Sequence, residues 1–198
     1  FNGVDSFSQY DQFETNDGTW RGEVADFNGD GRQDLAMFNY WGGCTAHLYI
    51  NQPGGFFNRS DPADTNDSYC LFSPPFPQNY GSRDRIAHSG AWGDYDNDGD
   101  PDLAVGHRID TTSAWIIQVF INNGGVLSDT NTTVVETAAY SGGFRYIYDL
   151  AWGDYNGDGY LDLAAAFSSW DSWPADSGDS GGFRIYQNNG GASFSQVY

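Results

Sequence analysis

The sequence predicts an all-β fold made of three repeats, and three observations support that prediction. An acidic loop of the form D-x-[D/N]-x-D-G-x-x-D occurs three times, starting at Asp26, Asp94 and Asp154. Each loop is followed by a short apolar run bounded by turn residues, which is typical of a buried strand. No stretch shows the apolar period of an amphipathic helix. Because self-similar segments indicate a repeat architecture, we interpret residues 1–198 as a single repeat domain.

Each repeat has two fixed parts separated by a variable insert. The first part is the acidic loop with the strand that follows it. The second part is an apolar triplet followed by Asn-Asn-Gly-Gly or a variant of it, in which asparagine and glycine allow the positive φ angles of a tight turn, so this part predicts a hairpin. The first part occurs at 24–38, 92–106 and 152–166, and the second at 48–56, 119–127 and 185–193.

The repeats are expected at about 11–70, 71–140 and 141–198. Residues 3–10, Gly-Val-Asp-Ser-Phe-Ser-Gln-Tyr, are similar to the last eight residues, Gly-Ala-Ser-Phe-Ser-Gln-Val-Tyr. That last segment follows a Gly-Gly turn, where the final strand of a repeat is expected. Residues 1–10 are therefore predicted to be a strand that completes a neighbouring repeat.

The acidic loops have the residue pattern of a calcium site. Side chains at loop positions 1, 3 and 5 alternate along the chain, and the glycine at position 6 permits the turn that folds them around one centre. Hard oxygen ligands in such number suit Ca²⁺, whereas Mg²⁺ requires a tighter octahedron and keeps its waters. We expect the backbone carbonyl of position 7 and the carboxylate of position 9 to complete the shell. The predicted ligands of three calcium ions are Asp26, Asn28, Asp30, Arg32 and Asp34; Asp94, Asp96, Asp98, Asp100 and Asp102; and Asp154, Asn156, Asp158, Tyr160 and Asp162.

An EF-hand loop begins in the same way, but it needs a glutamate at position 12 and flanking helices. Position 12 is Met37, Val105 or Ala165 in the three loops, and none of these side chains can bind calcium. The aspartate at position 9 is expected to replace it. The middle loop has four acidic side chains where the others have three and an asparagine, so its site is predicted to be the tightest.

The acidic loop followed by Asp-Leu-Ala, together with the later Asn-Asn-Gly-Gly turn, resembles FG-GAP or VCBS repeats. These are the calcium-loop blades of integrin α-subunit heads and of related propeller lectins. The resemblance covers all three repeats and implies that each is a four-stranded antiparallel blade of a β-propeller. Propellers typically have four to eight blades, and this family usually closes seven, so three blades predict a ring that this chain alone does not close.

Charge and composition restrict the partners. The net charge is −19, and all eight basic residues are arginine, which disfavours a nucleic-acid groove or an anionic membrane surface as partner. The 7 Trp, 13 Tyr and 14 Phe supply far more apolar area than a disordered chain has. No apolar run approaches the length needed to insert into a bilayer.

Cysteines and glycosylation sequons favour an extracellular, secreted or cell-surface location. Cys44 and Cys70 are the only cysteines and are predicted to form a disulfide. The segment that this disulfide would close contains Pro53 and is expected to have little regular structure. The N-x-[S/T] sequons predict glycans at Asn58 and Asn66 within that segment, and at Asn131 in the turn region after the second hairpin.

Two other functional classes stay open as alternatives. Aromatic residues in the inserts could bind glycans, which would make the protein a propeller lectin; they occur at Tyr40, Trp41, Trp115 and 170–173. Carboxylates outside the loops could form the acid and base pair of a hydrolase. His47, His88 and His107 belong to no catalytic motif and are interpreted as structural.

We therefore expect a non-enzymatic, calcium-binding structural or adhesive repeat protein of the extracellular space. Its expected partners are other protein chains, including copies of itself in a head-to-tail fibre, with glycans as a further class. Alternatively, the chain is a fragment of a larger adhesion protein, whose further blades close the ring.

Overall fold

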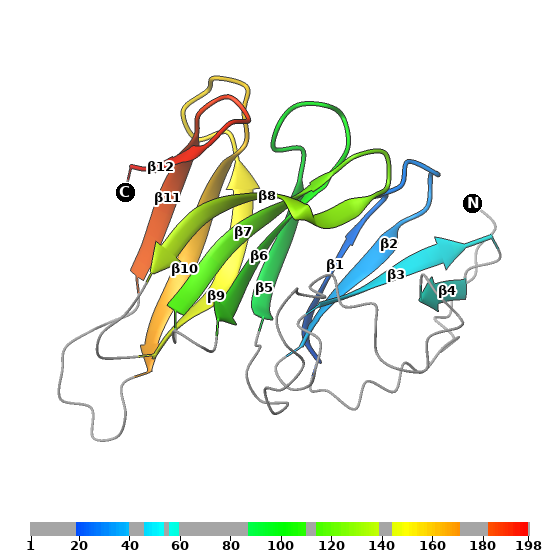
Figure 1. Ribbon diagram of the computed structural model, residues 1–198, viewed down its shortest axis with the longest axis horizontal. Helices are drawn as coiled ribbons and strands as arrows, with labels where there is room; N and C mark the ends of the chain where they lie inside the picture. The colour runs from blue at the N-terminus through cyan, green and yellow to red at the C-terminus, as the bar shows by residue number, and fades with distance from the viewer. Residues whose placement is uncertain are drawn as a thin grey trace, which may run out of the picture.

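The structure is a computed structural model that describes residues 19–39, 46–53, 56–59, 87–109, 114–138, 144–170 and 182–197. These residues form twelve strands and no helix, so no helix among them is long and apolar enough to cross a membrane. Figure 1 shows the strands in three groups that follow one another along the chain. The all-β prediction is confirmed for this part of the chain.

The first group contains β1 to β4, whose bounds are Thr19–Ala25, Asp34–Asn39, Ala46–Gln52 and Phe56–Arg59. The second contains β5 to β8, at Ala87–Gly93, Asp102–Ile109, Ala114–Asn122 and Leu127–Ala138. The third contains β9 to β12, at Phe144–Gly153, Asp162–Trp170, Gly182–Asn188 and Phe194–Gln196.

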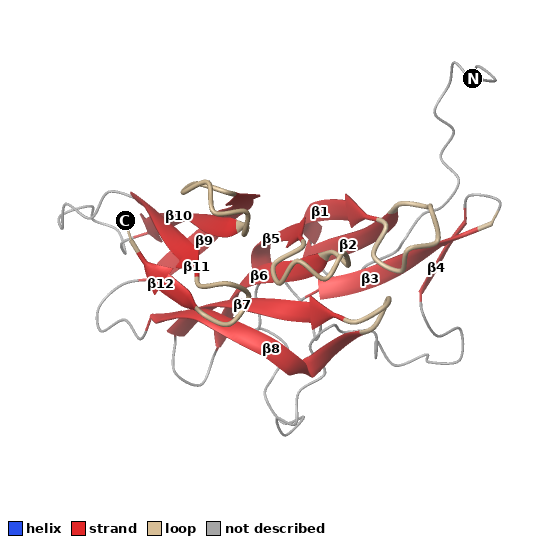
Figure 2. Cartoon of the chain, turned by 90° about the horizontal axis from the view of Figure 1, so that it is seen from above, coloured by secondary structure: helices blue, strands red, loops and turns tan. Residues whose placement is uncertain are grey.

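Each group is one antiparallel sheet whose strands pair in sequence order, and we call them sheets 1, 2 and 3. The acidic loop joins the first strand to the second in every sheet, and in sheets 2 and 3 the Gly-Gly turn joins the third to the fourth. The register is equivalent in all three sheets, because Leu35, Leu103 and Leu163 pair with Val24, Trp92 and Trp152. The described strands pair only within their own sheets, so the sheets form a propeller-like series that is not closed into a ring (Figure 2).

Two apolar clusters hold neighbouring sheets together. One contains Phe27, Phe38 and Leu48 of sheet 1 with Leu103 and Phe120 of sheet 2. The other contains residues of sheets 2 and 3, among them Tyr95, Ala104, Val119, Leu163 and Tyr186. The core therefore lies between the sheets, and burying these faces is the main force that assembles them.

Two details of the sequence prediction are wrong. The segment between the cysteines contains β3 and β4, so it is not poor in regular structure. Asn131 lies within strand β8 and not in a turn, because the turn ends at Val126 and the Thr-Thr-Val-Val run that follows has high β propensity.

Other predictions concern residues outside the described ranges. Among them are the strand at 1–10, the disulfide between Cys44 and Cys70 and the glycan at Asn66. The last strand of the third repeat is confirmed, because β12 pairs with β11 just after the turn at Gly190 and Gly191.

Candidate metal centre

The aspartate at position 1 organises each acidic loop by accepting the backbone N–H groups of positions 5 and 6. In the middle loop, Asp94 Oδ1 accepts the N–H of Asp98 at 3.0 Å and Oδ2 accepts that of Gly99 at 3.1 Å. Asp26 accepts the N–H groups of Asp30 and Gly31 at 2.9 and 2.8 Å, and Asp154 those of Asp158 and Gly159 at 3.1 and 3.0 Å. Glycine at position 6 has positive φ in all three loops, which is why only glycine suits it.

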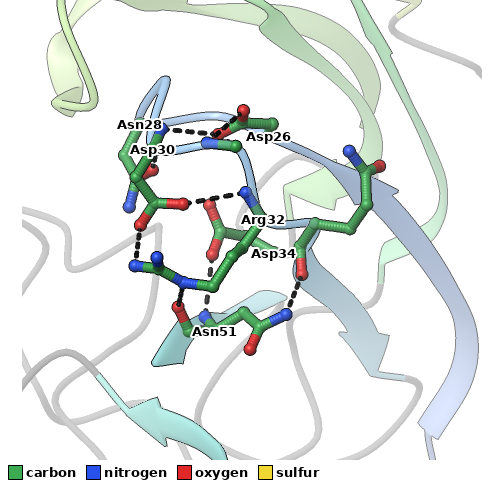
Figure 3. A network of polar contacts seen from close by, with 8 residues as sticks. Asp26, Asn28, Asp30, Arg32, Asp34 and Asn51 are labelled. Atoms are coloured by element: carbon green, nitrogen blue, oxygen red, sulfur yellow. Dashed lines mark hydrogen bonds and ion pairs between the residues drawn. The ribbon is translucent and has the colours of Figure 1, made fainter. Parts of the chain in front are cut away.

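The side chains at positions 3 and 5 continue the same pattern. The N–H of position 5 also bonds to the side-chain oxygen of position 3, which belongs to Asn28, Asp96 or Asn156. The N–H of position 7 bonds to the carboxylate of position 5 at 2.9 Å in every loop. Figure 3 shows this arrangement around Asp26, Asn28 and Asp30. The oxygens at positions 1, 3 and 5 are thus fixed by the loop's own backbone.

Position 9 is the buried end of each loop. Asp34 and Asp102 are 0% exposed and Asp162 is 1% exposed. Asp102 Oδ2 accepts the N–H of Tyr95 at 2.8 Å, and its Oδ1 accepts that of Asn122 at 2.8 Å. Asp162 does the same with Tyr155 and Asn188. This carboxylate therefore connects the loop to the third strand of its sheet, a structural role in addition to the predicted ligand role.

The structure brings three predicted ligands of the middle loop together. Carboxylate oxygens of Asp94, Asp96 and Asp102 lie within 4.8 Å of one another. Asp98 is outside that group, and its Oδ1 accepts the N–H of Asp100. Asn28 and Asn156 occupy the place of Asp96 in the other two loops, which have the same backbone contacts. Three converging carboxylates on a turn match the hard oxygen donors that Ca²⁺ prefers.

Burial and mutual repulsion make the charged state of this centre costly. Burial raises the pKa of Asp102 to about 6; the N–H groups of Asn122 and Tyr95 oppose the shift, and Asp96 and Asp98 add to it. Burial also raises the pKa of Asp96, with the charges of Asp98 and Asp94 acting in the same direction. A bound cation would remove this cost.

The first loop contains its own positive charge. The Arg32 guanidinium forms an ion pair with Asp30, and its Nε donates to the backbone oxygen of Asn51 at 2.7 Å (Figure 3). The sequence prediction gave Arg32 only a carbonyl role. Its side chain reduces the negative charge of the first loop, whereas Asp100 and Tyr160 place no cation at that position of the other loops.

One set of site residues was missed from the sequence. The first asparagine of each hairpin turn was interpreted as a turn residue, but Asn122 and Asn188 are buried. Asn122 Nδ2 donates to Pro101 O of its own loop and, at 2.7 Å, to Phe27 O in the loop of sheet 1. Asn188 Nδ2 likewise donates to Leu161 O and, at 2.8 Å, to Tyr95 O in the loop of sheet 2. These asparagines join each loop to the hairpin of the next sheet.

Family models match most of the chain. The model of the FG-GAP-like repeat matches residues 26–105 and 94–165, and that of the FG-GAP repeat matches residues 146–193. The chain belongs to the FG-GAP repeat family. Each FG-GAP-like match begins at position 1 of one acidic loop and ends in the second strand of the next sheet. Neither a curated protein nor a solved structure matches the chain.

The residues that motivated the lectin and hydrolase alternatives are either buried or outside the described ranges in most cases. Trp115 is 3% exposed and packs in the cluster between sheets 2 and 3, so it is a core residue of this FG-GAP protein. Tyr40, Trp41 and 171–173 lie outside the described ranges. His88 is buried against the rings of Trp115 and Tyr148, and His107 contacts Gln118 Oε1 at 3.2 Å. These two histidines have structural surroundings, as interpreted from the sequence.

Proposed function

We infer that this FG-GAP protein is a calcium-binding structural repeat protein of the extracellular space, in which each acidic loop holds one ion. The observation that carries the proposal is the convergence of Asp94, Asp96 and Asp102. The equivalent backbone contacts in the other two loops extend the proposal to three ions. Residues at positions 1, 3, 5 and 9 would supply side-chain oxygens, and position 7 its carbonyl.

Calcium in this position would act on stability. The loops join the first two strands of each sheet and contact the hairpin of the next sheet, so an ion that orders a loop also orders an interface between sheets. A ligand that binds only the native state stabilises it by mass action. FG-GAP repeats are in general structural, which agrees with a scaffold role for this chain.

The test is calcium titration by calorimetry, combined with thermal unfolding in excess calcium and in excess chelator. The expected results are three bound ions, the tightest at the middle loop, and a lower melting temperature after chelation. Magnesium at the same concentration serves as the control cation and is expected to stabilise less. A melting temperature that is equal in calcium and in chelator would contradict the proposal.

The extracellular location has its own test. After secretion from a host that glycosylates, intact-mass measurement with and without reductant and glycosidase should show one disulfide between Cys44 and Cys70, and glycans at the sequons. By the chain-entropy model, closing this segment stabilises the fold by roughly 3 kcal/mol. Two free thiols in the secreted protein would contradict the disulfide.

A further inference from the structure

Each sheet has two chemically different faces. We call the face that carries the alanine of Asp-Leu-Ala the alanine face, and the face that carries the leucine the leucine face. Cross-strand pairing puts Ala104, Ala91 and Val119 on one face of sheet 2, and Leu103, Trp92 and Phe120 on the other. The equivalent positions pair in the other sheets, where Ala36 pairs with Glu23 and Leu48, and Ala164 pairs with Ala151 and Ile185, so the register of the faces is the same in all three sheets.

The alanine faces of sheets 1 and 2 are buried under the next sheet. Ala36 and Ala104 are both 0% exposed, and so is Val119. The residues that cover them come from the leucine face of the following sheet, such as Leu103 on sheet 1 and Leu163 on sheet 2. The chain thus builds one and the same interface twice, alanine face against leucine face.

The alanine face of sheet 3 lacks this cover. Tyr155 is 59% exposed, although the equivalent Phe27 and Tyr95 are 4% and 0% exposed. Phe183 is 60% exposed, and Ala151 and Ala164 are also exposed. A contiguous apolar surface of this kind marks an interaction site.

The surroundings of one glycine show what is missing above this face, by comparison with the interface between sheets 2 and 3. A Cβ added to Gly93 of sheet 2 would lie 2.6 Å from Trp152 Cδ1, because the leucine-face tryptophan of the next sheet rests on that glycine. At the equivalent glycine of sheet 3, Gly153, no atom of the described residues lies within 4 Å of such a Cβ. The position that Trp152 fills above sheet 2 is open above sheet 3.

The polar contacts define what would fit there. Asn122 and Asn188 each donate Nδ2 to the carbonyl at position 2 of the preceding loop. Gly125 and Gly191 of the same hairpins lie against Asn28 and Asp96 at position 3 of that loop. The matching occupant is therefore a sheet with an apolar leucine face and an asparagine near the end of its third strand, at the place of Asn122 and Asn188.

Sheet 1 has these features at the other end of the described chain. Its leucine face presents Val24, which is 58% exposed, next to half-buried Leu35, while Tyr49 on the same face is buried. The exposed part of this face therefore lies on β1 and β2. Asn51 is the equivalent of Asn122 and Asn188, and its Nδ2 donates to Gln33 O of its own loop at 3.1 Å. The second acceptor, which Phe27 and Tyr95 provide to the other two asparagines, has no counterpart for Asn51 among the described residues.

We propose that the alanine face of sheet 3 binds the leucine face of sheet 1 from a second copy of this chain. Asn51 of that copy donates to Tyr155 O, and Val24 lies over Gly153. The contact joins two different surfaces, so it is heterologous and adds copies head to tail, giving a ring if the rotation closes and a filament if it does not. This proposal rests on the structural role proposed above, but the contact itself does not require that calcium is bound.

Two substitutions test the two faces separately. Ala164→Arg places a long charged side chain on the alanine face of sheet 3, and Val24→Arg does so on the leucine face of sheet 1. Val134→Arg is the matched control, because Val134 is 52% exposed on β8 of the middle sheet, away from both terminal faces. The mass of each protein in solution is measured by light scattering over a range of concentrations, in calcium and in chelator.

The wild type and Val134→Arg are expected to associate beyond dimers as concentration rises, while Ala164→Arg and Val24→Arg stay monomeric. A one-to-one mixture of these two variants retains one intact pair of faces, so it should form a dimer and nothing larger. The proposal is overturned if the wild type stays monomeric, if a face variant associates like the wild type, or if the mixture stays monomeric. Calcium calorimetry on the same samples reports separately on the proposed function.

Discussion

Asn188 on β11 reaches across to sheet 2 and donates its Nδ2 to the backbone oxygen of Tyr95 at 2.8 Å. The same side chain donates to Leu161 O and accepts the N–H of Gly191 through Oδ1 at 2.8 Å. One buried amide therefore holds its own loop, its own turn and the loop of the preceding sheet. The equivalent Asn122 makes the corresponding contacts between sheets 2 and 1.

Asn188→Ala is expected to destabilise the fold by about 3 kcal/mol, because it leaves buried backbone groups without hydrogen-bond partners. Asn189→Ala is the matched control: Asn189 is exposed, and its side chain donates to the hydroxyls of Ser193 and Ser195 of its own turn and strand. The control should stay within about 0.5 kcal/mol of the wild type. Urea unfolding measures both, and equal effects of the two substitutions would refute the role of Asn188.

Asp96→Asn gives the middle loop the same side chain at position 3 as Asn28 and Asn156. We expect the calcium affinity of the middle site to fall by about tenfold, since one ligand charge is lost. Without calcium, the variant should be more stable than the wild type at neutral pH, because burial and the nearby acids disfavour the charged form of Asp96.

Calorimetry and unfolding in chelator measure these two effects of Asp96→Asn. Asp149→Asn is the control, as it removes an exposed carboxylate outside the loops whose ion pair with Arg21 contributes little. Unchanged calcium affinity in Asp96→Asn would show that this carboxylate is not a ligand.

The acidic loops, the strands after them and the Gly-Gly turns could be predicted because their signals are local. Asp102 illustrates the limit: its place at the end of the loop could be predicted, but not its acceptance of the N–H of Asn122, twenty residues away. The contact of Asn122 with Phe27 O depends on how two sheets pack, and an Asn-Gly-Gly sequence also has a sufficient local explanation. By sequence, core packing is the favoured interpretation of Trp115 but a glycan-binding surface stays open, and the packing of sheets 2 and 3 places this residue in the core.

Gly90→Ala tests the close approach of sheets 1 and 2. A Cβ at Gly90 would lie 2.1 Å from Phe38 Cζ, so the substitution should cost about 2 kcal/mol of unfolding free energy. Gly153→Ala is the control in an equivalent sheet, where no atom in the described part of the chain lies within 4 Å of the added Cβ, and it should leave the monomer's stability nearly unchanged.

A double-mutant cycle completes that test. Adding Phe38→Leu to Gly90→Ala should cost less than the sum of the single substitutions, because the smaller side chain relieves the clash. Strictly additive costs would indicate that Gly90 matters for another reason.

His88 predicts a pH dependence. Burial lowers the pKa of His88 to about 4, from 6.5 in the unfolded chain. Below pH 6.5 the unfolded state takes up a proton that the folded state resists, so stability falls from pH 6.5 to about pH 4, by about 3 kcal/mol for this group alone. His88→Gln should remove this part of the slope.

Asp102 acts in the opposite direction, because its raised pKa of about 6 makes protonation favour the folded state as pH falls. The prediction for His88 is therefore read from the difference between the wild type and His88→Gln, in excess calcium, by urea unfolding at each pH. Parallel curves for the two proteins between pH 6.5 and 4 would contradict it.

The acceptors of the inter-sheet asparagines are main-chain oxygens, those of Phe27 and Tyr95. A carbonyl is the same whatever side chain stands on its residue, so a substitution at this position keeps the hydrogen bond as long as the new side chain packs. Neighbouring repeats can then diverge in sequence without paired changes. Gene duplication could lengthen such an array by whole units, since every added unit carries both the donor and the acceptor that its neighbours require.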